Sequence, residues 1–120
     1  MKKIIYLLAL ILICSTPLYS QELKVGAALR VITPDPLIPV SGGVGTPSPA
    51  TEKKGDLFVR AMVMEQNGVK VAIVGIDNLG WPAVLGDQSR ALIKGIPPEN
   101  ILIGATHTHS APDAYGFPNE

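Results

Sequence analysis

Apolar and polar positions along this chain form short runs of strand length, separated by glycine, proline and asparagine. Residues 22–32 (ELKVGAALRVI) alternate loosely and become β-branched toward their end, which predicts a strand. Residues 56–66 (DLFVRAMVMEQ) and Val69–Ile76 (VKVAIVGI) lie on either side of Asn67-Gly68. Two β-rich runs around Asn-Gly predict a β-hairpin, and the nearly all-apolar second run is expected of a strand covered on both faces.

A helical pattern and another strand follow the hairpin. Residues 81–94 carry apolar side chains at helical spacing, with Pro82 suited to the first turn and Gly95 to the C-terminal stop. The apolar run Ile101–Ala105 predicts a buried strand, which a βαβ connection would place parallel to Val69–Ile76. The sequence therefore predicts an α/β fold: a partial mixed sheet in which a β-hairpin is followed by a βαβ unit, as a fragment of a larger α/β domain.

Residues 37–54 are rich in glycine and proline, which predicts a long loop. Loops of more than about 12–15 residues without their own secondary structure are usually functional or disordered. The segment is interpreted either as a flexible lid or substrate rim or as a plain connector. Residues 41–45 (SGGVG) resemble a phosphate cradle in their glycines, but they lack the Lys-Ser/Thr ending and no helix pattern follows.

The first twenty residues have the three-part pattern of a secretory signal peptide. Two lysines give a positive start, an apolar run follows, and a small residue, Ser20, ends it. The apolar run is shorter than the roughly 20 residues that a membrane-spanning helix needs. Cleavage after Ser20 would leave residues 21–120 as an exported chain, periplasmic or secreted and bacterial in type. A lipidated Cys14 is the weaker alternative, because Ile13 is not a small residue.

Loss of the signal changes the charge and the cysteine content of the chain. Without Lys2 and Lys3, 8 basic and 10 acidic residues remain, and a net charge of about −2 argues against a nucleic-acid-binding surface. Cys14 is the only cysteine, so the exported chain has no disulfide. A chain of this length buries a modest core. The fold must therefore be held by an ordinary core or by a metal, and nothing in the sequence indicates an oligomeric state.

Both histidines of the chain, His107 and His109, directly follow the last apolar run and alternate with Thr and Ser. If extended geometry continues past Ala105, the two imidazoles point to the same side. Such a pair can bind a metal ion or polarise one substrate oxygen. For an isolated His-x-His, however, solvated loop rings or hydrogen-bonded core rings are the commoner outcome. The spacing alone leaves both interpretations open.

A second polar cluster (DNLG) follows Val69–Ile76 and begins with Asp77. Because the two strands of a βαβ unit are parallel, Asp77 and His107 are predicted at the same edge of the sheet, where open α/β sheets place ligands. Asp77 is interpreted either as a turn residue or helix N-cap, which is the commoner role, or as a catalytic carboxylate that orients an imidazole or a metal-bound water.

Two segments carry a family resemblance. Residues 25–34 contain Val-Gly-Ala-Ala and Val-Ile-Thr-Pro, and residues 104–112 read GATHTHSAP. The second segment is similar to the T-H-T-H-S-G-P signature of the neutral/alkaline, non-lysosomal ceramidase family, with Ala111 where glycine is usual. The similarity spans about residues 24–116. It implies that residues 21–120 form the N-terminal portion of a zinc-dependent amidase domain, which hydrolyses the N-acyl bond of ceramide to sphingosine and a fatty acid.

The resemblance also implies roles for single residues. His107 corresponds to a zinc ligand, and His109 to a catalytic group near the scissile carbonyl that stabilises the oxyanion or shuttles a proton. The family's remaining ligands, a further His, a Glu and a Tyr, lie well downstream of the signature, and nothing here matches them. Because catalytic zinc generally has three or more protein ligands, residues 21–120 alone are expected to be inactive. A lipid-like N-acyl amide substrate also implies peripheral contact with membrane lipid.

Two other classes of protein stay open at this point. Metal-dependent amidohydrolase barrels also carry His-x-His at a strand end, but there the pair usually closes the first barrel strand, whereas a hairpin and a βαβ unit precede it here. An exported binding module that keeps the fold without the chemistry is the non-enzymatic alternative, and Ala111 in place of glycine keeps it open. A reading frame continuing past Glu120 with another His, Glu and Tyr would favour the amidase.

Overall fold

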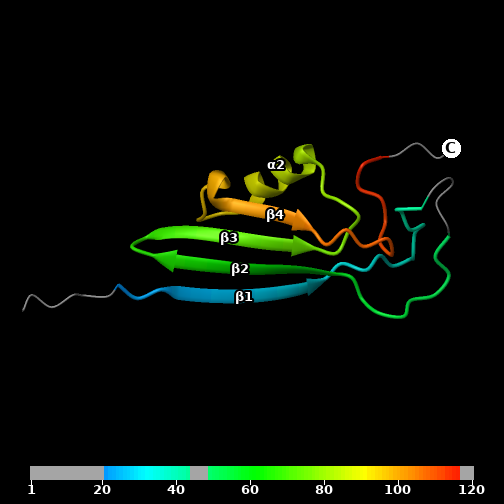
Figure 1. Ribbon diagram of the computed structural model, residues 1–120, viewed down its shortest axis with the longest axis horizontal. Coiled ribbons are helices and arrows are strands. Elements are labelled where there is room, and N and C mark those ends of the chain that lie inside the picture. The colour runs from blue at the N-terminus through cyan, green and yellow to red at the C-terminus, as the bar shows by residue number, and fades with distance from the viewer. Residues whose placement is uncertain (1–20, 44–48, 117–120) are drawn as a thin grey trace, which may run out of the picture.

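A four-stranded mixed sheet with the strand order β1-β2-β3-β4 forms the frame of the molecule (Figure 1). The computed structural model describes residues 21–43 and 49–116. The predicted signal peptide, residues 1–20, lies outside these ranges, as does part of the predicted loop 37–54. Within the described ranges, no helix has the length and apolar composition needed to cross a membrane. The sheet, one α-helix and a short 3-10 helix confirm the predicted small α/β arrangement.

The first three strands are antiparallel neighbours. β1 (Lys24–Val31) pairs with β2 (Phe58–Gln66), and β2 pairs with β3 (Val69–Ile76). The connection between β2 and β3 is the predicted two-residue turn, in which Asn67 and Gly68 both have a positive φ, 56° and 77°. Positive φ at both positions matches the right-handed twist of the flanking strands. The hairpin prediction is confirmed.

The fourth strand completes a βαβ unit. α2 (Ala83–Leu92) and η1 (Pro98–Asn100) connect β3 to β4 (Ile101–Ala105), and β4 pairs with β3 in parallel. α2 is shorter than residues 81–94, because Pro82 forms its N-cap and the chain turns extended at Ile93. The parallel pairing is confirmed, and it places the carboxyl ends of β3 and β4 at the same edge.

The buried core lies on one face of the sheet. Ala72 and Ile76 share that face of β3, and Ile101 of β4 lies beside Ala72, with exposed fractions of 3%, 9% and 4%. α2 lies behind β4 in Figure 1 and covers this side. On the other face of β3, Val71 and Ile73 are 37% and 40% exposed. The prediction of a strand covered on both faces is therefore wrong for the described residues, since an apolar run gives no information on which faces receive a neighbour.

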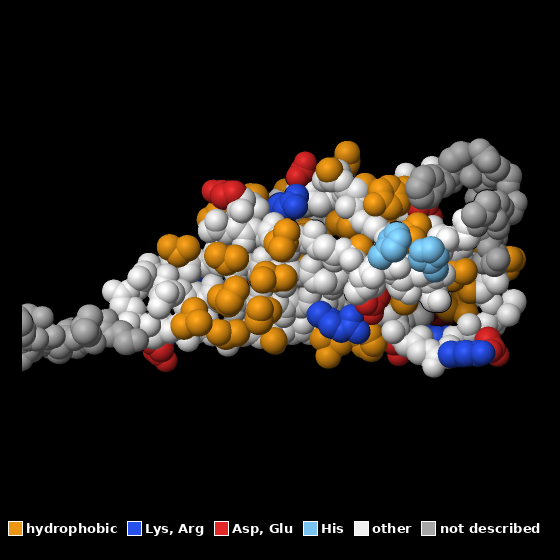
Figure 2. All heavy atoms as spheres, viewed as in Figure 1, with side chains coloured by type: hydrophobic (Ala, Val, Ile, Leu, Met, Phe, Trp, Pro, Cys, Tyr) orange, Lys and Arg blue, Asp and Glu red, His pale blue; other side chains and the backbone are white. Residues whose placement is uncertain are grey.

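The face of the sheet opposite α2, called here the open face, is apolar (Figure 2). The strand register places these exposed apolar side chains on it: Val25, Leu29, Val31, Met62, Val69, Val71, Ile73 and Leu102. Arg60 lies on the same face, opposite Gly75 of β3. Small residues beside it leave a shallow hollow of about 570 Å³.

Candidate functional site

The three residues predicted to carry chemistry lie at the carboxyl edge of the parallel strand pair. β3 ends at Ile76 and β4 at Ala105, and these two residues are register partners. Asp77 directly follows β3, while His107 follows β4 after one intervening residue. The backbone N–H of Thr106 still donates to the carbonyl oxygen of Ile76 at 3.0 Å. The parallel pairing thus brings the Asp77 segment and the His107 segment together, as the sequence predicted.

His107 leaves the strand geometry. Its φ is +61°, in the left-handed region that non-glycine residues rarely adopt, so extended backbone does not continue past Ala105. Its ring nitrogen Nδ1 lies 2.7 Å from the carbonyl oxygen of Leu79, in the turn that follows β3. Because a carbonyl oxygen only accepts, Nδ1 must carry the proton in this hydrogen bond. In the neutral ring this leaves Nε2 with its lone pair free to bind a metal ion.

His109 converges on His107 by a different route from the predicted one. The two rings meet edge to face, with centroids 5.1 Å apart and an angle of 82° between their planes. Both rings lie exposed and next to each other at the surface (Figure 2). Strand alternation does not bring them together, since His107 is left-handed and the chain bends at residues 109–111. The predicted convergence is present although its predicted cause is not.

The loop between β1 and β2 holds His109 from the other side. Gly42 has a φ of +102°, and a Cβ at this position would lie 2.6 Å from Cγ of His109. One residue earlier, the N–H of the buried Ser41 donates to the carbonyl oxygen of Ala111 at 2.8 Å. Ala111 itself is fully buried. The loop therefore packs against residues 109–111. Because Gly42 has no side chain, the His109 imidazole can approach it closely.

A second glycine in the β3–α2 turn accommodates Tyr115. A Cβ on Gly80 would overlap the Tyr115 ring and its hydroxyl oxygen. Gly80 is buried and directly follows Leu79, whose carbonyl binds His107. His107 and Tyr115 thus both contact the turn that begins at Asp77. On the side of the turn, these contacts depend on the Leu79 carbonyl and on the missing side chain of Gly80, neither of which has a recognisable chemical signature in the sequence.

Asp77 binds neighbours other than the imidazoles. Its carboxylate accepts from the backbone N–H of Phe58 at 2.9 Å and from Nη1 of Arg60, which is 2.9 Å from each of its oxygens. Burial raises the pKa of Asp77, but the hydrogen bonds from Arg60 and Phe58, the Arg60 charge and the Thr106 hydroxyl outweigh burial and hold the pKa below its usual value. Among the described residues, no hydrogen bond joins this carboxylate to either imidazole.

The described residues supply only part of a metal-binding site, namely the two histidines. Nowhere in residues 21–43 and 49–116 do three His, Cys, Asp or Glu side chains gather closely enough to bind an ion. The donor chemistry of the pair nevertheless suits Zn²⁺, because neutral imidazole is one of its preferred ligands and the Leu79 carbonyl fixes the ring of His107 from behind. Any further ligands would have to come from other residues.

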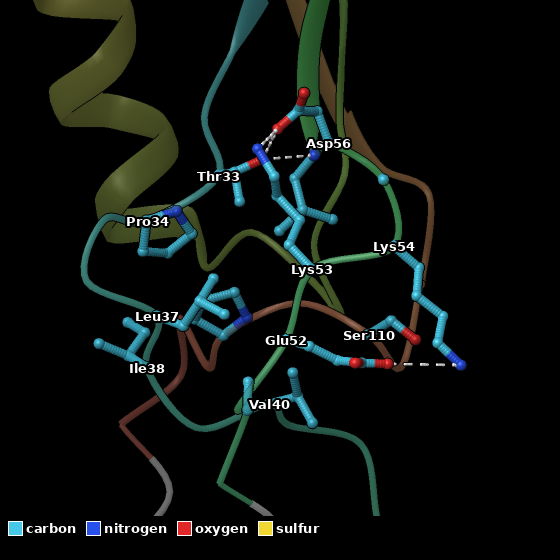
Figure 3. A pocket seen from close by; sticks show the side chains of 14 residues that line it. Thr33, Pro34, Leu37, Ile38, Val40, Glu52, Lys53, Lys54, Asp56 and Ser110 are labelled. Carbon is cyan, nitrogen blue, oxygen red and sulfur yellow. Dashed lines mark hydrogen bonds and ion pairs between the residues drawn. The ribbon is translucent and has the colours of Figure 1, made fainter.

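A cavity of about 440 Å³ lies beside the histidine segment (Figure 3). Ser110 and Pro112 form one wall, and the β1–β2 loop forms the other with apolar side chains such as Leu37, Ile38 and Val40. Charged residues line its rim, among them Lys53, which is paired with Asp56 at 2.8 Å, and Lys54, which lies 3.7 Å from Glu52. This apolar cavity was not predicted from the sequence. The apolar residues within the glycine- and proline-rich loop 37–54 could have indicated it.

Sequence reasoning also missed the contributions of Gly42, Leu79 and Arg60. Leu79 and Gly42 act through a carbonyl and a missing Cβ, which leave no chemical signature in the sequence. Arg60 had one, because it is the single charged residue in the apolar run FVRAMVM. No family model matches the chain, and no curated protein or solved structure matches it significantly.

Proposed function

We propose that this chain is the N-terminal part of the catalytic domain of a zinc-dependent amidase, with the N-acyl bond of ceramide as the expected target and sphingosine and a fatty acid as products. The observation that carries the proposal is the arrangement of the two imidazoles. His107 has Nδ1 bound by the Leu79 carbonyl, and its ring meets His109 at 5.1 Å. This arrangement lies at the carboxyl edge of parallel strands, the usual place of ligands in open α/β sheets.

The two histidines have separate roles in this proposal. His107 would hold Zn²⁺ through Nε2, because the Leu79 carbonyl keeps the proton of the neutral ring on Nδ1. Zinc, when bound, supplies an acidified water ligand and a Lewis acid for the amide carbonyl. His109 faces the reacting carbonyl, where its ring donates a hydrogen bond to the developing oxyanion or passes a proton to the leaving amine. The contact with Gly42 fixes the distance between His109 and the loop.

The substrate class follows from the resemblance and is compatible with the cavity beside Ser110. An acyl chain needs an apolar surface close to the scissile carbonyl, and the cavity offers apolar walls within the same loop cluster as the histidines. A lipid-like amide would be drawn from a membrane surface, which suits an exported protein. Because two imidazoles do not complete a catalytic zinc site, the 120-residue chain itself is expected to lack amidase activity, and the complete site would use a further His, Glu and Tyr.

Zinc titration of the 120-residue chain tests the proposal. We expect Zn²⁺ to shift the imidazole signals of the two histidines in NMR spectra, and His107→Ala to weaken binding by at least tenfold. Asp87→Asn, in a surface ion pair on α2, serves as the control and should leave the affinity within about twofold. An unchanged zinc affinity in His107→Ala would refute the assignment and favour an exported binding module of the same fold.

A further inference from the structure

The cavity beside Ser110 and the imidazole of His109 are held together by the same pair of chain segments. Ser110 lines the cavity and directly follows His109. Across from them, the N–H of the buried Ser41 donates to the carbonyl oxygen of Ala111 at 2.8 Å. The next residue of that loop, Gly42, contacts the His109 ring. The β1–β2 loop therefore borders the cavity and the imidazole at once, and a ligand in the cavity lies next to the proposed reaction site.

The cavity is apolar, and its own wall residues do not fill it. Its volume of about 440 Å³ lies within the range of about 300–1,000 Å³ that is usual for small-molecule sites. Ile38 lines this cavity and is nevertheless 46% exposed. Figure 3 shows Leu37, Ile38 and Val40 on one side in this view and Ser110 on the other. The apolar lining includes Pro34, Leu37, Ile38, Val40, Leu57 and Pro112.

The charged side chains at the rim of the cavity neutralise one another. Lys53 pairs with Asp56 at 2.8 Å, and Asp56 also accepts a hydrogen bond from the Thr33 hydroxyl. Lys54 lies 3.7 Å from Glu52. The described lining thus carries two basic and two acidic side chains, with neither sign in excess. A carboxylate or ammonium head group finds no unpaired countercharge at this rim and is costly to desolvate, whereas an uncharged head group costs less.

We infer that this cavity holds the acyl chain of an uncharged N-acyl amide and places the amide carbonyl beside His109. The inference rests on the proposed function, because it assigns one half of the proposed substrate to a site. In an N-acyl amide the acyl chain begins directly at the carbonyl carbon. In ceramide, by contrast, hydroxyl groups lie between the amide nitrogen and the other alkyl chain. An apolar wall that begins next to His109 therefore suits the acyl side, and the amine leaves on the side away from the cavity.

The first test measures ligand binding to the 120-residue chain without zinc. The probe is N-decanoyl ethanolamine, an uncharged amide with a single alkyl chain, used below the concentration at which it aggregates. We expect saturable binding by calorimetry, and binding of N-butanoyl ethanolamine weaker by at least about tenfold, because affinity rises with each buried methylene. Decanoate and decylammonium should bind no more tightly than the amide. Tighter binding of either ion by about tenfold or more would overturn the assignment of an uncharged head group.

Variants then locate the bound chain. Val40→Trp fills the cavity and should weaken binding of N-decanoyl ethanolamine by at least about tenfold. Val84→Trp, on the exposed side of α2, and Ile73→Lys, on the open face, should leave the affinity within about twofold. Circular dichroism melts check folding, and Ile38→Trp decides if Val40→Trp does not fold. Undiminished binding in the folded tryptophan variant, or loss in Ile73→Lys instead, would overturn the inference.

The last test places the carbonyl and separates this inference from the proposed function. We expect N-decanoyl ethanolamine to shift the imidazole signals of His109 in NMR spectra of the metal-free chain. A ligand that occupies the cavity and leaves these signals unchanged would overturn the placement of its carbonyl. A chain that binds zinc but not the amide would overturn the acyl-chain site alone. Binding of the amide in the cavity by a chain that takes up no zinc would overturn the proposed amidase function and support the cavity as a binding site for alkyl amides.

Discussion

His107 donates from Nδ1 to the carbonyl oxygen of Leu79 across 2.7 Å, joining the segment after β4 to the turn after β3. The two residues are 28 positions apart in the chain, and the parallel pairing of β3 with β4 is what brings them together. A backbone carbonyl is a fixed acceptor, so it sets both the orientation and the tautomer of the ring. The turn after β3, which carries no recognisable motif, thus determines which ring nitrogen of the proposed zinc ligand His107 remains free.

Substitution of His107 should separate backbone strain from metal binding. Asparagine tolerates a φ of +61° better than other non-glycine residues, whereas a β-branched residue is a clear outlier there. We expect His107→Val to lower the free energy of unfolding by about 1–3 kcal/mol and His107→Asn to lower it by less, measured by urea denaturation. Both variants should lose zinc binding. Equal stability of the two variants would contradict the strained conformation.

Gly42→Ala should displace His109. The new Cβ would lie 2.6 Å from Cγ of His109, on a backbone with a φ of +102°, so the loop and the ring cannot both stay in place. We expect a shifted His109 imidazole signal and a loss of about 1–3 kcal/mol in the free energy of unfolding. Gly43→Ala is the matched control, because a Cβ there meets nothing within 4 Å. The contact would be disproved by a Gly42→Ala chain whose His109 signal matches the wild type.

Acidification should reveal the Asp77 ion pair. The pKa of Asp77 is held below its usual value in the folded chain, so an unfolded chain, with an aspartate pKa near 3.9, binds the proton more readily. The stabilisation is therefore present above about pH 4 and is lost as the pH falls through the folded pKa. We expect Asp77→Asn to be less stable than wild type near neutral pH and to lose less stability on acidification, measured by denaturant melts between pH 7 and pH 2.

Asp56 provides an independent check on that reasoning. Hydrogen bonds from Lys53 and then Thr33 lower its pKa, so the same sign applies to it. It joins the two ends of the β1–β2 loop through its hydrogen bonds with Thr33 and Lys53. The double variant Asp77→Asn, Asp56→Asn should show a flatter pH profile than either single variant. A double variant that keeps the full wild-type slope would assign acid sensitivity to other groups.

The open face should make the isolated chain self-associate. Monomeric soluble proteins rarely expose large contiguous apolar patches, and such patches usually mark interaction surfaces. Ile73 lies within this face and is 40% exposed. We expect the wild-type chain to show concentration-dependent association in sedimentation velocity experiments and Ile73→Lys to reduce it. Val84→Lys is the control, since Val84 is 67% exposed on α2, away from the open face. A monomeric wild-type chain at high concentration would contradict this expectation.

The local elements of the fold could be predicted from short-range patterns. Asn67-Gly68 specifies the hairpin because both positions need a positive φ, which these residues adopt at low cost. The run Ile101–Ala105 specifies β4, and the helical pattern before it requires a parallel crossover. From these features alone the sequence placed Asp77 and His107 at one edge of the sheet.

Contacts between segments distant in the chain could not be predicted, because they depend on backbone groups and on small clearances. No sequence pattern indicates that Leu79 presents its carbonyl to His107, or that Gly42 lies under His109. The exposure of Val71 and Ile73 likewise depends on which faces of the sheet receive a neighbour. Sequence determines periodicity and turn chemistry, which act over a few residues, whereas the tertiary fold alone decides which groups meet, because packing couples residues with no local constraint on one another.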